Sequence, residues 1–389
     1  MSKSFLPYGR QSINEQDVQA LSQAALEEII TRGKHVEAFE SALAEYCGAE
    51  YAVAFNNGTS ALQACYFAAQ TSSNDYVLTT PNSFFSTCGS ALASTSNIVF
   101  IDIDRSTGNM DLSALEPNLN RTQTRGKEII VPVHFAGIPV DIEKIERMIR
   151  RTDTVIIEDA AHAIGSRYAD GNPVGCCQHS QMTMFSFHPV KNITTGEGGA
   201  VTTNDPELFH RLRLFRNNGI ERNPQKMEQH PGPWYYEVQV ATGNYNFTDI
   251  QAALGLSQLK RLDTFAAKRR ALVGYYRELL EGLKGIQLFN ADDENTAFHL
   301  MVAQIDFARF GKTRPEIMDK LMQKGIGTQV HYIPIYRHPA MRQVVGDISE
   351  FYPNMEGYYA AALSLPLYYE LELPEVKYIV TTLRSLLGC

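Results

Sequence analysis

Short apolar segments alternate with stretches of helical periodicity from Tyr51 onward, and this alternation constrains the fold more than any other feature of the chain. Five segments have the length and apolar content of buried strands: residues 52–55, 75–79, 98–101, 129–133 and 154–157. Such alternation predicts an α/β fold, with a mostly parallel central sheet covered by helices on both faces. Ligands of these sheets bind at the carboxyl ends of the strands. Five residues of interest fall at those ends: Thr59, Phe84, His134, Asp159 and Lys191.

Helical periodicity also marks both ends of the chain. Residues 14–45 predict two helices, with apolar positions at Val18, Leu21, Ala25 and Ile29 in the first and a glycine turn at Gly33. A helix-like run from 248 through 262 leads into a C-terminal region that ends in a helix around 376–387. We therefore expect a large domain over residues 1–250 and a smaller α+β domain over residues 251–389.

The segment 217–239 shows neither helical nor strand periodicity. It is rich in Asn, Pro, Gln and Gly and contains Trp234, the only tryptophan of the chain. Structureless segments of this length in compact domains usually serve a function. We expect a long functional loop or an interface segment here.

Composition excludes several classes of protein. The chain has 389 residues, 44% of them hydrophobic, so it can bury a large core. Its net charge is −8, and no block of Lys or Arg forms a basic stripe, which argues against nucleic acid as a partner. The opening residues contain no apolar signal region, and no apolar run has the length of a membrane span. A cytoplasmic protein without a membrane partner is expected.

The six cysteines are scattered, and Cys176 and Cys177 form a vicinal pair that is awkward for one disulfide. We expect free thiols. His179 follows this pair closely, but no second Cys or His pair lies nearby to complete a tetrahedral shell. No metal site is expected.

Lys191 follows a strand-like run over 185–190 and precedes the glycine-rich segment 194–199. Glycines let backbone approach a ligand closely, and desolvation lowers the pKa of a lysine. A lysine in such a place becomes an amine that captures carbonyl groups. The alternative is a solvated surface lysine, which is the commonest fate of this residue type.

Two further features suit a pyridoxal phosphate site. Asp159 ends an apolar strand and can hold the protonated ring nitrogen of this cofactor, although it can equally cap a helix that begins at Ala160. The segment 54–62 passes from an apolar strand through small polar residues into a helix, whose first turn favours a phosphate. An ordinary capped helix is the alternative. Together with Lys191, these features predict bound pyridoxal phosphate.

Three motifs in this order resemble the DegT/DnrJ/EryC1/StrS family of nucleotide-sugar aminotransferases: N-N-G-T-S-A-L, E-D-A-A-H-A and S-F-H-P-V-K-N-I-T-T-G-E-G-G-A-V. The similarity runs over essentially the whole chain, from residues 6–10 to residues 330–336. Within the family, L-P-Y-G-R-Q-S-I, H-P-V-K-N-I-T-T-G-E-G-G and Q-V-H-Y-I-P-I-Y are most similar to the members of the pseudaminic acid pathway.

The resemblance implies the fold-type I, aspartate-aminotransferase-like architecture and pyridoxal 5'-phosphate (PLP) bound covalently as a Schiff base to Lys191. Asp159 would keep the ring nitrogen protonated, and Lys191 would act as base and acid. His162 would touch the cofactor or, alternatively, donate a hydrogen bond to backbone. One ring of Phe84 and Phe85 would stack on the cofactor, while the other joins the core if the pair alternates as in a strand. The implied phosphate ligands are Gly58, Thr59, Ser60 and Ser186.

Asn244 matches the family position that reaches the phosphate from a neighbouring subunit, which implies a homodimer with shared active sites. The sequence departs from the common family form at Asn246, where an arginine is frequent. Without that guanidinium, contacts to the partner subunit and to the carboxylate of the amino donor are open questions.

The implied substrate is a UDP-linked keto sugar, with the following candidate contacts: Tyr8, Ile30, Thr31, Arg32, Gly33, Gln329, His331 and Tyr332. The predicted reaction transfers an amino group from L-glutamate to C4 of a UDP-4-keto-6-deoxy-N-acetylhexosamine. Alternatives are another 4-keto nucleotide sugar, of the perosamine or 4-amino-arabinose type, and a non-catalytic regulatory protein of the same fold. Sugar dehydratases of this fold replace the lysine, so Lys191 argues against that class.

Overall fold

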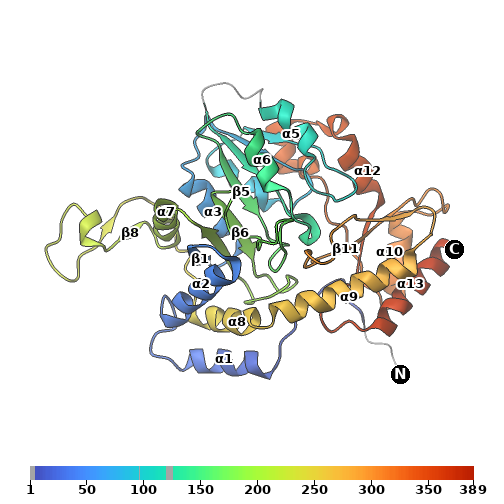
Figure 1. Ribbon diagram of the computed structural model, residues 1–389, viewed down its shortest axis with the longest axis horizontal. Coiled ribbons are helices and arrows are strands. Elements are labelled where there is room, and N and C mark those ends of the chain that lie inside the picture. The colour runs from blue at the N-terminus through green and yellow to red at the C-terminus, as the bar shows by residue number, and fades with distance from the viewer. Residues whose placement is uncertain (1–4, 96, 120–125) are drawn as a thin grey trace.

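The computed structural model describes residues 5–95, 97–119 and 126–389 and shows two β-sheets with helices packed around them (Figure 1). Met1–Ser4, which belong to the opening segment predicted to lack a signal region, lie outside these residues. In the described part of the chain, no helix is long and apolar enough to cross a membrane.

The larger sheet has seven strands in the described residues, in the order β1-β7-β6-β5-β4-β2-β3. The strands are β1 (Tyr51–Phe55), β2 (Tyr76–Thr79), β3 (Ile98–Phe100), β4 (Glu128–Val131), β5 (Val155–Asp159), β6 (Met182–Ser186) and β7 (Gly199–Thr203). β3, β2, β4, β5 and β6 pair in parallel, whereas β7 is antiparallel to both β6 and β1. The link from β6 to β7 is a loop rather than a crossover helix, and such a link joins antiparallel neighbours. The five predicted strand segments and the mostly parallel sheet are confirmed.

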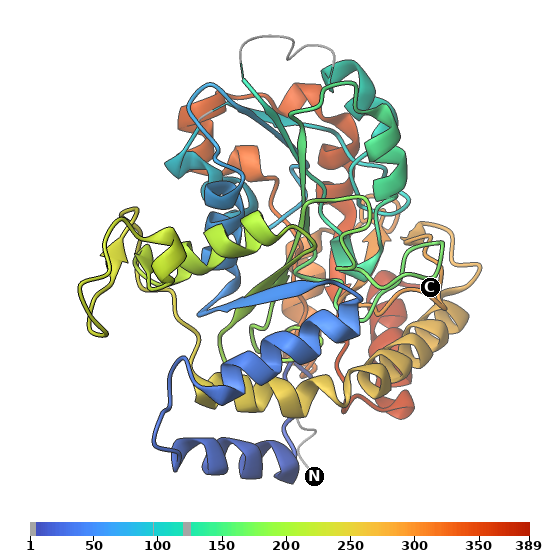
Figure 2. The same cartoon turned by 60° about the vertical axis from the view of Figure 1, so that its left-hand side comes forward.

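Both faces of this sheet are buried, because alternate residues of one strand enter different core clusters. Val53 and Ile129 pack in one cluster, and their chain neighbours Ala54 and Ile130 pack in two others. Side chains of a strand alternate between faces, so layers must cover both sides of the sheet. Figure 2 shows helices on the two sides. The covering helices include α3 (Gly58–Ala68), α4 (Ser86–Gly89), α5 (Leu112–Leu119), α6 (Ile142–Met148) and α7 (Pro206–Arg216).

The N-terminal region forms two helices, α1 (Glu15–Ala25) and α2 (Lys34–Cys47), as predicted. The predicted extension of the first helix to Ile29 is wrong, since α1 ends at Ala25 and the chain then turns toward Gly33, the N-cap of α2. Only Asp17 and Ala24 of α1 are buried, although α1 packs along α8 (Asp249–Leu259). Asp17 Oδ2 accepts a hydrogen bond from Gln258 Nε2 at 2.8 Å.

The smaller sheet is antiparallel and consists of β10 (Ile286–Leu288), β11 (Met301–Ile305) and β12 (Ala362–Leu365). It shares a core cluster with residues of α9 (Leu262–Leu280), α10 (Arg314–Gln323) and α13 (Leu373–Leu387). Leu6 joins the same cluster, since it bridges to Ile326. The division of the chain between residues 250 and 251 stays a prediction.

The shorter helices connect these layers. They are α11 (Pro339–Val345), α12 (Pro353–Ala361) and the 3₁₀ turns Ala91–Ala93, Phe135–Gly137, Pro224–Lys226, Ile335–Arg337 and Ser349–Phe351. The turn Phe135–Gly137 follows β4 and contains Ala136 with φ of 57°. It lies at the carboxyl edge of the larger sheet, where its backbone meets the candidate site.

The segment 217–239 forms an arm that projects from the body at the left of Figure 1. It contains a two-stranded antiparallel ribbon of β8 (Ile220–Glu221) and β9 (Glu237–Val238). Trp234 is 71% exposed on this arm, and Tyr236 and Val238 are exposed as well. The arm therefore presents an apolar surface that this subunit does not cover.

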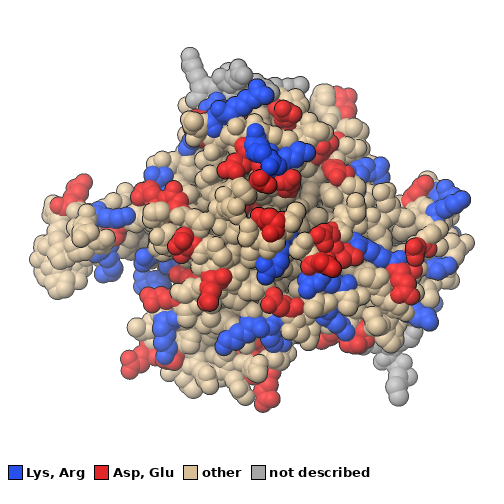
Figure 3. All heavy atoms as spheres, viewed as in Figure 1, with Lys and Arg blue, Asp and Glu red and all other residues tan. Residues whose placement is uncertain are grey.

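Charges are mixed over the face of the molecule in Figure 3, where Lys and Arg side chains alternate with Asp and Glu. The six cysteines are free, five of them buried and Cys389 exposed. Among the described residues, no group of three or more His, Cys, Asp or Glu side chains is arranged to hold a metal ion.

Gly175 and Gly171 allow a test of the packing around β6. Both have a φ in the left-handed region, but a Cβ at Gly175 would lie 2.6 Å from Phe185 and one at Gly171 would meet no atom within 4 Å. Gly171→Ala should lower the free energy of unfolding by about 1 kcal/mol, from backbone strain alone. Gly175→Ala adds a steric clash and should cost about 2–4 kcal/mol. Urea unfolding of the two variants measures the difference, and equal losses would contradict this account of the packing.

Candidate active site

Asp159 and Lys191 lie at the carboxyl ends of two neighbouring strands. Asp159 is the last residue of β5 and pairs with Met184 of β6, and Lys191 is in the loop that follows β6. This loop is closed by its own hydrogen bonds, since Phe187 O accepts Thr195 N–H at 3.0 Å and Thr194 Oγ1–H at 3.0 Å. A Cβ at Gly198 would lie 2.1 Å from Thr195 Oγ1, so the closed loop requires glycine there. The loop thus holds Lys191 at a defined place beside the sheet.

Burial lowers the pKa of Lys191 to about 8, while the charge of Asp159 acts in the opposite direction. The charge of Lys191 in turn helps to lower the pKa values of His162, His299 and His331, after the larger effect of their burial. The charge of the amine therefore acts on all three rings. With a pKa near 8, about a tenth of the amine is unprotonated at pH 7, which suits a nucleophile.

Asp159 is 4% exposed, and both carboxylate oxygens accept a hydrogen bond. Thr87 Oγ1 donates to Oδ2 at 2.6 Å, and Ala161 N–H donates to Oδ1 at 3.2 Å. Burial raises the pKa of Asp159, and these hydrogen bonds oppose the rise. No helix begins at Ala160, because the chain continues in turns. A carboxylate has about four acceptor positions, so Asp159 can still accept a hydrogen bond from a protonated ring nitrogen.

A candidate phosphate cradle lies where α3 begins, beside the end of β6 and the start of β7. Asn57 caps α3, since its Oδ1 accepts the Ser60 N–H at 2.8 Å. A Cβ at Gly58 would lie 3.0 Å from Ser186 Cβ, and one at Gly199 would lie 2.7 Å from Gly58 Cα. The close approach of the three segments leaves backbone N–H groups at the helix N-terminus, the arrangement that favours a phosphate.

The predicted phosphate ligands differ in whether their hydroxyl groups already make hydrogen bonds within the protein. Ser60 is buried, and its one hydroxyl hydrogen is shared between Asn56 Oδ1 at 2.7 Å and Asn57 O at 2.8 Å. Thr59 is exposed at the start of α3. Gly58 and Ser186 face each other across the cradle. The hydroxyl of Thr59 is therefore better placed than that of Ser60 to meet an incoming anion.

His162 contacts backbone, but in the opposite sense to the predicted alternative. The expectation that it would donate to backbone is wrong, because its Nδ1 accepts the Ala136 N–H at 3.3 Å, from the turn in which Ala136 has φ of 57°. Nε2 then carries the proton of the neutral ring and lies 3.0 Å from the hydroxyl of Tyr332. The ring also packs against His299, with centroids 4.4 Å apart.

Phe84 and Phe85 lie in the turn that leads into α4 rather than in a strand, and their side chains separate there. Phe84 is 61% exposed and faces Tyr332, with ring centroids 6.4 Å apart. Phe85 packs against the core, beside Gly89 and His338. Phe84 is therefore the ring that remains available for a ligand.

The predicted sugar contacts fall into two groups. Tyr8, His331 and Tyr332 form one group with His162, with Tyr8 and His331 centroids 5.4 Å apart. Burial lowers the pKa of His331 to about 3, so this ring is neutral at physiological pH. Gln329 is exposed beside this group, and its backbone pairs with Ser364.

The second group lies around the start of α2 and the base of the arm. Arg32 has φ of 54°, and its Nη1 donates to Asn217 Oδ1 at 3.4 Å. Asn246 Nδ2 donates to the same oxygen at 3.1 Å and to Asn244 Oδ1 at 2.7 Å. Arg32, Gly33, Asn217 and Asn246 line a groove of about 700 Å³. Ile30 and Thr31 precede it, held by Asp249 N–H and by a bridge to Thr248.

Three residues near the site were not predicted from the sequence. Thr87 holds Asp159, His299 packs under His162, and Glu158 anchors the opposite face of β5. Thr87 and His299 carry no local motif, because they reach the site from α4 and from the segment before β11. Glu158 stands within the E-D-A-A-H-A motif, so its position beside Asp159 was a usable signal.

Comparison with known proteins agrees with this geometry. A model of the DegT/DnrJ/EryC1/StrS aminotransferase family matches residues 11–384. The chain is 35% identical to UDP-4-amino-4,6-dideoxy-N-acetyl-beta-L-altrosamine transaminase of Campylobacter jejuni, over 98% of each chain. The structure of Helicobacter pylori PseC, an aminotransferase involved in the biosynthesis of pseudoaminic acid, has a TM-score of 0.87 at 29% identity, over 99% of this chain and 100% of that one. The PLP-form of the putative sugar aminotransferase Spr1654 from Streptococcus pneumoniae has a TM-score of 0.88 at 26% identity, over 99% of each chain.

The fold and the site define a PLP-dependent sugar aminotransferase of fold-type I. The chain belongs to the DegT/DnrJ/EryC1/StrS aminotransferase family. Its cofactor is pyridoxal phosphate, bound as a Schiff base to a lysine. The residues present fit this cofactor. A desolvated amine, a buried carboxylate and the cradle at the N-terminus of α3 lie at one edge of the sheet. The predictions of family, fold class, enzyme and cofactor are confirmed.

The lowered pKa of Lys191 predicts how the protein captures its cofactor. Only the unprotonated amine attacks the aldehyde, so the rate of reconstitution of the cofactor-free protein should rise about tenfold per pH unit below pH 8 and level off above it. Asp159→Asn removes the charge that raises this pKa, so the midpoint should move to lower pH. Stopped-flow absorbance with added PLP measures both profiles. A midpoint near the ordinary lysine pKa would contradict the desolvated amine.

Proposed function

We propose that the enzyme transfers an amino group from L-glutamate to C4 of a UDP-4-keto-6-deoxy-N-acetylhexosamine, a step of pseudaminic acid biosynthesis. The observation that carries the reaction type is the Lys191 amine, desolvated beside the buried carboxylate of Asp159. The substrate is supported by the similarity to the Campylobacter jejuni transaminase and to PseC.

Lys191 is the residue proposed to hold the cofactor and to move protons. When bound, pyridoxal phosphate supplies an electron sink that stabilises a carbanion at the reacting carbon. Nζ of Lys191, with a pKa of about 8, can take up and return a proton near neutral pH. Asp159 would keep the ring nitrogen protonated, with its orientation fixed by Thr87 Oγ1 at 2.6 Å.

The phosphate and the ring would be held by the surroundings of these two residues. We assign the phosphate to the first turn of α3, with Gly58, Thr59 and Ser60, and to Ser186, which faces Gly58 from the end of β6. The helix dipole and the backbone N–H groups of that turn favour an anion. Phe84 is the aromatic side chain proposed to cover the ring, since Phe85 is packed into the core. His162 would orient Tyr332 through the 3.0 Å contact at Nε2.

Tyr8, His331 and Tyr332 are proposed to bind the sugar. The Lys191 charge helps to lower the pKa of His331, and the rings of Tyr8 and Tyr332 lie 5.4 and 4.9 Å from the His331 ring. His331 is neutral, and its Nδ1 is 2.8 Å from Ser364 Oγ. Its role is therefore stacking or neutral hydrogen bonding rather than pairing with a diphosphate charge.

Asn244 is proposed to complete the active site of a second subunit in a homodimer. It is exposed, and it lies near Arg32 and Asn217 rather than near Tyr8 and His331. A partner subunit would bring its own group around Arg32 and Asn217, with Ile30–Gly33 at the edge, to the residues proposed to bind the sugar. Asn246 offers hydrogen bonds to Asn217 and Asn244 where family members often have an arginine, and Arg32 is a cation that contacts this cluster. The exposed Trp234 on the arm gives the dimer an apolar contact.

A panel of 4-keto sugars tests the proposed substrate. With L-glutamate present, the UDP-4-keto-6-deoxy-L-arabino-configured acetamido sugar should give its 4-amino product and an equal amount of 2-oxoglutarate. Its kcat/KM should exceed that of a UDP-4-keto-arabinose or a GDP-4-keto sugar at least about tenfold, because a lost polar contact in a binding site costs that much or more. Lys191→Ala should abolish product formation with every sugar. Faster turnover of either other sugar would contradict the substrate assignment.

Mixing two inactive variants tests the shared active site. Lys191→Ala keeps Asn244, and Asn244→Ala keeps Lys191, so a mixed dimer contains one complete site. After co-refolding in equal amounts, activity should return to about a quarter of the wild-type level, since half of the dimers are mixed and each has one complete site of two. Activity that stays at the sum of the separate variants would contradict a site shared between subunits.

A further inference from the structure

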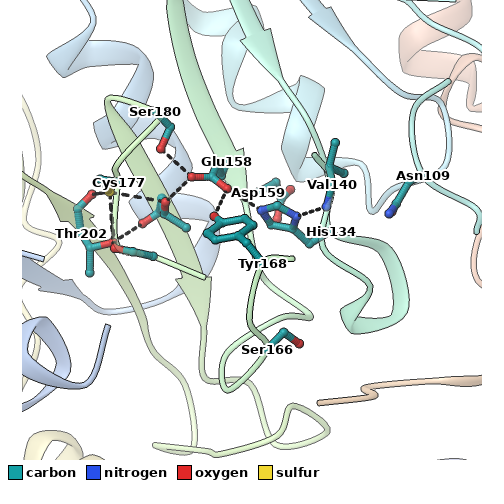
Figure 4. A network of polar contacts seen from close by, with 12 residues as sticks. Asn109, His134, Val140, Glu158, Asp159, Ser166, Tyr168, Cys177, Ser180 and Thr202 are labelled. Atoms are coloured by element: carbon teal, nitrogen blue, oxygen red, sulfur yellow. Dashed lines mark hydrogen bonds and ion pairs between the residues drawn. The ribbon is translucent and has the colours of Figure 1, made fainter. Parts of the chain in front are cut away.

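Glu158 is a fully buried carboxylate that stands next to Asp159 on β5 but faces the opposite side of the sheet (Figure 4). Successive side chains of a strand point to opposite faces, so Glu158 does not line the cofactor side. A buried charge is costly unless hydrogen bonds compensate it. The surroundings of Glu158 show how complete that compensation is.

Four donors surround the Glu158 carboxylate, two on each oxygen. Oε2 lies 2.7 Å from His134 Nε2 and also accepts the Tyr168 hydroxyl. Oε1 accepts the hydroxyls of Ser180 at 2.5 Å and Thr183 at 2.8 Å. His134 Nδ1 accepts the Val140 N–H at 2.9 Å, so the proton of the neutral imidazole is on Nε2 and points to Glu158.

These contacts fix Glu158 as an anion. Burial alone would raise the pKa of Glu158, but hydrogen bonds from His134, Ser180 and Tyr168 bring it below its ordinary value. All four partners donate, and only an ionised carboxylate accepts at every position. The cluster therefore favours the ionised form of Glu158.

The cluster ties together the chain segments that hold Asp159. Its donors come from the end of β4, the loop after β5 and the region of β6. The backbone of the same segments is joined at Asp159 itself, since His134 N–H donates to Asp159 O at 3.0 Å and Asp159 N–H donates to Pro132 O at 2.9 Å. A shift at Glu158 would therefore move the backbone that carries the Asp159 side chain.

We propose that Glu158 is a positioning residue for Asp159, which clamps the carboxyl end of β5 from the back of the sheet and so aims the Asp159 carboxylate at the cofactor ring nitrogen. The proposal rests on the role assigned to Asp159 above. A glutamine at this position has one acceptor oxygen, so its amide NH₂ would face two donors. Unpaired buried donors force the local structure to adjust.

Glu158→Gln tests the proposal through binding and spectroscopy. Its dissociation constant for PLP should rise about tenfold. The pH midpoint of the bound-cofactor absorbance should move up by at least about half a unit, because a ring nitrogen that is held less firmly withdraws fewer electrons from the imine. The control is Glu128→Gln, which changes another buried glutamate. Glu128 is the first residue of β4, so it lies at the amino end of its strand, whereas Asp159 lies at the carboxyl end of β5. This control variant should leave affinity and midpoint unchanged.

A folded Glu158→Gln protein with the wild-type affinity and midpoint would overturn the proposal. If this variant does not fold, Tyr168→Phe and Ser180→Ala each remove one donor, and each should weaken PLP binding about threefold with the same direction of spectral change. Unchanged binding and midpoint in both would also overturn it.

Asp159→Asn separates this inference from the proposed function. If Asp159→Asn alters the midpoint but Glu158→Gln does not, only the role of Glu158 is wrong. If Asp159→Asn leaves the midpoint unchanged, the role assigned to Asp159 itself is wrong, and the positioning of that residue has no function to serve.

Discussion

The site depends on a lysine amine that is held out of water beside a buried carboxylate. Desolvation lowers the pKa of Lys191 to about 8, and the negative charge of Asp159 keeps it from falling further. Both residues owe their places to the register of β5 and β6, because Asp159 ends one strand and the closed loop with Lys191 follows the other. A change in that register would separate the amine from the carboxylate and remove the property on which the chemistry rests.

The rest of the larger sheet supports this pair. Its two faces are buried in different clusters, so its strands cannot slide without exposing apolar side chains. The Glu158 cluster joins the ends of β4, β5 and β6 on one face, and Thr87 holds Asp159 on the other. β7 returns antiparallel to β6, which brings Gly199 beside Gly58 and closes the phosphate cradle. The fold thus delivers an amine, a carboxylate and an anion cradle to one edge.

The parts of the site that were predictable from the sequence are those written in short segments. Lys191, Asp159 and the turn at Gly58 each stand at the end of an apolar strand, and the strands are visible from their periodicity. Thr87 and His299 were not predictable, because only the folded chain brings them to Asp159 and His162. The end of α1 and the separation of Phe84 from Phe85 depend on tertiary packing, which periodicity does not encode. The dimer and the division at residue 250 stay predictions.

The most direct test of the account is to find which lysine carries the cofactor. The PLP-loaded enzyme is reduced with borohydride, which fixes the Schiff base, and is then digested and mapped by mass spectrometry. The account predicts one pyridoxyl group per chain, on the peptide that contains Lys191, and none on that peptide in Lys191→Ala. A pyridoxyl group on another lysine, or no stable modification in the loaded enzyme, would contradict the central claim that the loop after β6 holds the reactive amine.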